Sequence, residues 1–109
     1  MANQASRRSM ETLRDAAPEV ADAFVALRSA VDASGPLDAK TRALIICGAF
    51  VATNNEVGFR SHCQRAVAAG ATPEELRQEI LLALGFTQGV ANVARGLTWL
   101  DETMGLPEG

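Results

Sequence analysis

The sequence predicts an all-α domain of about six helices built round a central helical hairpin at residues 38–70. No segment shows the alternation of apolar and polar residues that is typical of a half-buried strand. Glycine and proline divide the chain into pieces of helical length. Aromatic residues make up only 5% of the chain, so small and aliphatic side chains must build a core of closely packed helices. The 109 residues suffice for one domain, which we place at residues 9–109 after a flexible segment at 1–8.

Two helices are expected before residue 36. A short one runs over residues 9–16, and Pro18 suits the first turn of the next. That second helix carries one apolar stripe with spacings of four, three and four residues, formed by Val20, Phe24, Leu27 and Val31. The sequence Ser-Gly-Pro at 34–36 ends it.

The third helix is predicted over residues 38–53, with Asp38 as its N-cap. Every residue from 43 to 52 is apolar, cysteine or glycine, and a helix that is apolar on all sides is expected to be buried on all sides. A chain of this length has difficulty covering one helix so completely. We therefore expect part of the cover to come from another subunit.

Three further helices are expected after the turn at 53–55. The fourth runs over residues 56–69 and is closed by Gly70. Thr72, Pro73 and Glu75 form a capping box with proline at the first helical position, so a fifth helix begins there and ends near Gly85. The last helix carries an apolar seam suited to packing against another helix, formed by Val90, Val93, Leu97, Leu100 and Met104.

Charge and composition exclude several classes of function. The formal net charge is -3 and no basic patch is visible, which argues against a nucleic-acid partner. The longest apolar run is far shorter than the roughly 20 residues of a membrane span, and no secretory signal opens the chain. We therefore expect a cytoplasmic protein with no membrane partner. In a reducing compartment, Cys47 and Cys63 are expected to be thiols.

Two stretches of the hairpin resemble the carboxymuconolactone decarboxylase family, which has the alkylhydroperoxidase D-like fold. The run Leu-Asp-Ala-Lys-Thr-Arg at 37–42 is similar to the family's LDxKTRE opening. His62, Ala66 and the run Ala-Gly-Ala-Thr-Pro-Glu-Glu-Leu at 69–76 are similar to its HxxxAxxxGATxEEI stretch. The resemblance covers residues 18–100 and is most specific over 38–84. It implies the helical fold, a homo-oligomer (a trimer or a hexamer) and a functional role for His62.

The family has two chemical branches, and this chain departs from both. The peroxidase branch uses a CxxC pair seven and four residues before the histidine and a glutamate on the preceding helix. Here those positions hold Asn55, Gly58 and Ala43, so peroxidase activity of that kind is not expected. The decarboxylase branch reads ELRxHxRxA, and the run at 58–66 keeps Arg60, His62 and an alanine but has glycine in place of the glutamate. Its YxGxPAA segment is matched only in part at 86–92.

Five residues are candidates for a site that binds a small carboxylated ligand. His62 is the natural proton carrier, although it could equally be a half-buried histidine bonded to a carbonyl. Arg60 or Arg42 could hold a carboxylate; alternatively, Arg60 pairs with Glu56 one turn earlier, and Arg42 points into solvent. Gln88 and Asn92 could line the same cavity as His62 or cap the preceding helix.

The two cysteines are a possible redox pair. If the third and fourth helices form an antiparallel hairpin, Cys47 and Cys63 lie at similar depth, within ~3 Å along the axis, and could touch. The alternative is two small buried apolar residues. A metal site is not expected, because one histidine without nearby carboxylates or thiolates supplies too few ligands.

These observations support two classes of function. One is cofactor-free acid/base chemistry, a decarboxylation or isomerisation of a small carboxylated lactone or related acid, with His62 moving the proton. The other is a non-catalytic helical oligomer that has lost the family's chemistry. A thiol redox protein that uses Cys47 and Cys63 is a third possibility.

Overall fold

The computed structural model describes residues 2–105 of the chain, and their side chains from residue 8 onward. It confirms the all-α prediction. The chain forms six helices in this range: α1 (Ala2–Ala16), α2 (Pro18–Asp32), α3 (Ala39–Ala52), α4 (Glu56–Ala68), α5 (Pro73–Leu82) and α6 (Val90–Met104). None of these helices is long and apolar enough to cross a membrane.

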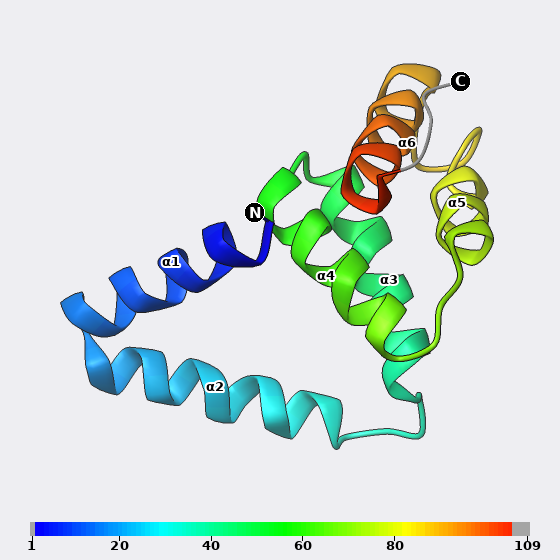
Figure 1. Ribbon diagram of the computed structural model, residues 1–109. Coiled ribbons are helices and arrows are strands. Elements are labelled where there is room, and N and C mark those ends of the chain that lie inside the picture. Colours follow the sequence, from blue (N-terminus) through cyan, green and yellow to red (C-terminus); the bar gives the residue numbers. More distant parts are fainter. Residues whose placement is uncertain (1, 106–109) are drawn as a thin grey trace.

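Figure 1 shows two parts: α1 and α2 form an arm, and α3 to α6 form a body. The helices α3 and α4 are the closest-packed pair, as expected for a central hairpin, and α5 and α6 pack against them. The core of the body is contributed by all four of its helices, through the fully buried residues Cys47, Phe59, Cys63, Leu76, Ile80 and Leu100. The arm meets the body where α1 packs against α4.

The predicted helix ends are formed by the predicted residues. Asp38 caps α3 by accepting from the Thr41 amide at 2.8 Å. Thr72 and Glu75 form the reciprocal capping box of α5, at 3.1 and 2.9 Å. The turn between α3 and α4 places Asn54 at φ 58°, a left-handed conformation that asparagine tolerates.

The first helix is longer than predicted. It begins at Ala2, whereas we expected it to begin at Ser9. The correction has a simple reason: residues 2–16 contain neither glycine nor proline, so nothing prevents the helix from extending toward the amino terminus.

The long apolar run of α3 is only partly covered by its own chain. Cys47 and Val51 are buried, but Ile45 is 56% exposed. The apolar stripe of α2 is also exposed, including Phe24 at 45%. The seam of α6 packs inward at Val93 and Leu100, which are buried.

Candidate functional site

His62 lies at the middle of α4 and is half-buried. Its Nδ1 lies 3.1 Å from the carbonyl oxygen of Gly58. A carbonyl only accepts hydrogen bonds, so Nδ1 carries the proton in this contact and the neutral ring keeps Nε2 as a free acceptor. The ring of Phe50 packs on the imidazole, with centroids 5.1 Å apart. The ring is therefore held in one orientation by a hydrogen bond and a tilted ring–ring contact.

Gly58 makes this arrangement possible. Its amide donates to the Asn55 side chain at 2.9 Å, which caps α4, and its carbonyl receives the His62 proton. A Cβ at residue 58 would lie 2.6 Å from the ring of Phe50, too close for any side chain. The absence of a side chain at residue 58 therefore lets Phe50 approach α4 and contact His62.

The surroundings of His62 favour the neutral imidazole. Burial lowers its pKa below 6.5, the positive charges of Arg65 and Arg28 lower it further, and the Gly58 hydrogen bond and Asp32 oppose them only in part. The imidazole is consequently uncharged at pH 7 and able to accept a proton. A general base at neutral pH needs this state.

A cavity of about 220 Å³ lies between α2, α3 and α4, and His62 forms part of its wall. We call it the arginine cavity, because its polar lining consists of Arg28, Asp32, Arg42, His62 and Arg65. Ala43 also lines it. A glutamate at that position, as in the peroxidase branch, would project a carboxylate into this space, whereas alanine leaves it open.

The side chains that line the arginine cavity carry a net positive charge. Asp32 pairs with Arg28 at 3.2 Å and with Arg42 at 3.6 Å. Arg65 has no ion pair among the described side chains. One carboxylate therefore offsets three guanidinium groups, and the cavity has the charge of an anion site.

The structure separates Arg60 from His62. Arg60 faces α6, where it pairs with Glu102 at 2.6 Å and donates to Thr103 at 3.1 Å. Within α4 it also pairs with Glu56 at 2.9 Å. Residues 60 and 62 differ by about 200° around the helix, so a cavity that contains His62 excludes Arg60. Arg60 therefore forms the ion pair with Glu56 that was the alternative to ligand binding.

Gln88 and Asn92 bond to each other instead of joining His62. The Asn92 amide donates to the Gln88 side chain at 2.8 Å and accepts from Arg95 at 3.0 Å. Both lie around the start of α6, and neither lines the arginine cavity. Of the predicted ligand-binding residues, the structure brings only Arg42 to His62.

Three residues of the cavity were not predicted from the sequence. Arg65 lies one turn after His62 on the same helical face, so helical spacing could have identified it. Arg28 and Asp32 lie on α2, which is adjacent to His62 only through the path of the chain. No motif marks them.

Cys47 and Cys63 are fully buried and touch each other. The contact between the two thiols and their burial raise the pKa of Cys47. Both are free thiols. The predicted juxtaposition is therefore present, in surroundings that suppress the reactive thiolate. Within the described residues no group of histidine, cysteine and carboxylate side chains could hold a metal.

A comparison with protein-family models shows which family the chain belongs to. The model for the carboxymuconolactone decarboxylase family matches residues 18–102. The chain belongs to the carboxymuconolactone decarboxylase family. No curated protein and no solved structure gives a significant match. Family membership thus confirms the resemblance found in the sequence, and the geometry around His62 must supply the argument for chemistry.

Proposed function

We propose that this member of the carboxymuconolactone decarboxylase family binds a small carboxylic acid in the arginine cavity and moves a proton to or from it through His62. One observation carries the proposal: a neutral imidazole shares a cavity with three arginines that only one carboxylate offsets. The guanidinium groups would bind the carboxylate, and the imidazole would lie beside the rest of the molecule.

The reaction would require no cofactor. In an isomerisation, Nε2 removes a proton from a carbon near the bound carboxylate and returns it at another carbon. In a decarboxylation, the bond to the leaving carboxylate breaks, CO2 departs, and the carbon takes a proton from the imidazolium. Binding an anion raises the pKa of a nearby histidine, so the acid form becomes available once the ligand is present. A small carboxylated lactone or a related acid fits both reactions.

The arginines and the histidine can be tested separately. A thermal-shift screen with dicarboxylates and carboxylated lactones should raise the unfolding midpoint, because a ligand of the native state stabilises it. Arg42→Gln and Arg65→Gln should each weaken that shift, whereas Arg60→Gln, on the opposite face, should leave it unchanged. His62→Gln should retain binding and abolish turnover of an acid that the screen identifies.

The outcome can contradict the proposal at either step. If no acid shifts the midpoint of the wild-type protein, the arginine cavity is not a carboxylate site. If His62→Gln retains full turnover, the imidazole does not carry the proton.

Exposed apolar residues favour an oligomer, with or without catalysis. Ile45 on α3 and Leu27 on α2 are exposed, as is Phe86 at 92% on the connection between α5 and α6. Large exposed apolar surfaces commonly mark interfaces. We propose that copies of the chain associate, as a trimer or a hexamer, and light scattering after size exclusion would measure the mass. In the non-catalytic alternative, this association is the function and no acid binds.

A further inference from the structure

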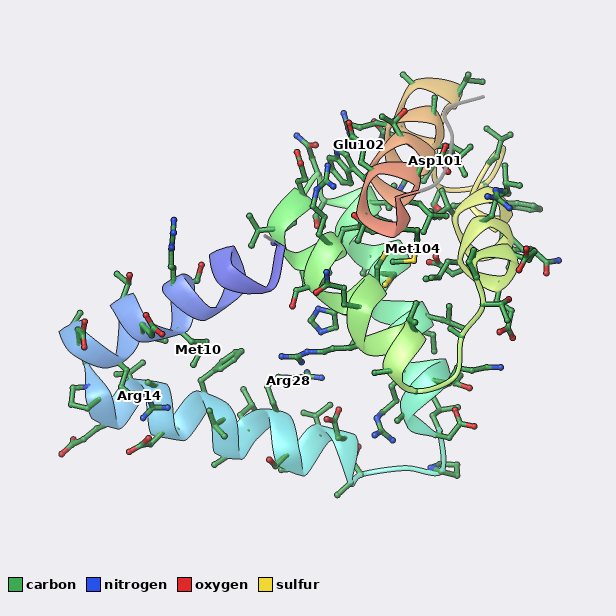
Figure 2. The ribbon with its side chains drawn as sticks, in the orientation of Figure 1. Met10, Arg14, Arg28, Asp101, Glu102 and Met104 are labelled. Atoms are coloured by element: carbon green, nitrogen blue, oxygen red, sulfur yellow. The ribbon has the colours of Figure 1, made fainter. Side chains whose placement is uncertain are left out.

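A second cavity lies on the other side of His62. Its volume is about 320 Å³. Its apolar lining consists of Met10, Phe24, Phe50 and Val57, and the polar residues Ser9 and Asn55 also line it. We call it the apolar chamber. Met10 lies on α1 and Phe24 on α2, so the chamber occupies the space between the arm and the hairpin, where Figure 2 shows Arg28 extending from α2 toward α4.

The arginine cavity and the apolar chamber share one wall. His62, Arg28 and Arg65 line both of them. The charged groups beyond this wall, Asp32 and Arg42, lie only on the arginine side. The two cavities are therefore adjacent: further charged groups lie on the side of the arginine cavity, further apolar groups lie on the side of the apolar chamber, and the imidazole lies at their border.

From this division we infer that the ligand is an amphipathic monocarboxylate, whose carboxylate pairs with Arg28 and Arg65 and whose apolar body lies in the apolar chamber. The inference rests on the proposed function and specifies its ligand. The ring of Phe24 is 45% exposed, so an apolar body would remove its surface from water. The carbons nearest the carboxylate would then lie beside His62.

Size and charge favour a small molecule over a second copy of the chain. Ligand cavities typically measure about 300–1,000 Å³, and the apolar chamber falls at the lower end of that range. A helix with its side chains is about 10 Å across and would need a larger space. Arg65 also lacks an ion pair among the described side chains, and a carboxylate would supply one.

The test is a series of straight-chain acids: acetate, butanoate, hexanoate and octanoate, titrated into the full-length protein and measured by calorimetry. Burial of each methylene should tighten binding about fourfold until the chamber is filled. Phe24→Gln should flatten this dependence while leaving the affinity for acetate unchanged. Val90→Gln, at an exposed position on α6, is the matched control and should behave like the wild type.

The outcomes distinguish this inference from the function on which it rests. If small dicarboxylates bind but octanoate binds no better than acetate, the inference is wrong and the carboxylate site stands. If no acid binds at all, both fail. If Phe24→Gln reduces the mass of an oligomer and chain length has no effect, a second copy occupies the chamber and the inference is overturned.

Discussion

Glu79 on α5 is a carboxyl group whose removal should stabilise the protein at alkaline pH. Its Oε2 is buried without a hydrogen-bond partner, and its Oε1 occupies the space that a side chain at residue 48, a glycine, would need. Burial raises the pKa of Glu79 from 4.5 to about 8. The folded protein therefore disfavours the carboxylate, which the unfolded chain solvates freely.

The direction of the pH dependence follows from the raised pKa. Between pH 4.5 and 8 the folded state holds a proton that the unfolded state releases, so stability falls as pH rises through this interval. The full shift corresponds to about 5 kcal/mol. Over pH 6.5 to 8.5 the full shift would give a loss of about 2 kcal/mol. Water reaches part of the side chain and lowers this penalty, so we expect a loss of about 1 kcal/mol.

Urea unfolding at pH 6.5 and 8.5 measures this loss. Glu79→Gln keeps the shape of the side chain and removes its titration, so the variant should lose little stability over the interval and exceed the wild type at pH 8.5. Glu74→Gln, an exposed change on the same helix, is the control and should follow the wild type. Equal losses in the wild type and Glu79→Gln would refute the reasoning.

Three further predictions concern the hairpin. Gly58→Ala should lower the free energy of unfolding by about 1–3 kcal/mol in urea titrations, because its Cβ meets Phe50; Gly35→Ala, where nothing lies within 4 Å, should change it little. His62 is the only histidine, so its imidazole NMR signals should titrate below pH 6.5, at higher pH in Arg65→Gln and at lower pH in Asp32→Asn. A value at or above 6.5 in the wild type would contradict its burial. Cys47 and Cys63 should react with iodoacetamide more than about tenfold slower in the folded protein than in urea, and mass spectrometry under mild oxidant should show an intrachain disulfide rather than a dimer if the pair oxidises at all.

The sequence predicted the features that depend on residues close together in the chain, such as the helix caps. Asp38, Thr72 and Glu75 act within one helical turn, and such caps can be recognised from spacing alone. The contact of Cys47 with Cys63 was also predictable. The turn fixes the register of the hairpin, and the rise per residue then places the two cysteines at similar depth along it.

The arginine cavity depends on contacts that spacing does not encode. Arg28 and Asp32 reach His62 only because the arm returns α2 to the hairpin, and this path depends on how α1 packs against α4. Arg60 was misleading for the opposite reason. Its place in a family motif suggested a ligand, while its partners Glu102 and Thr103 lie more than forty residues away in sequence.

At three positions where the peroxidase branch has reactive residues, this chain has Asn55, Gly58 and Ala43. Each of them shapes the structure around His62. Asn55 caps α4, Gly58 admits Phe50 against His62, and Ala43 leaves the arginine cavity open. A cysteine at residue 58 would displace Phe50, and a glutamate at residue 43 would occupy the space beside the arginines. The same substitutions that remove thiol chemistry therefore orient the histidine and preserve a cationic cavity next to it. Because Gly58 and Ala43 leave His62 oriented beside an open cationic cavity, we favour a ligand-binding role for His62 over a purely structural one.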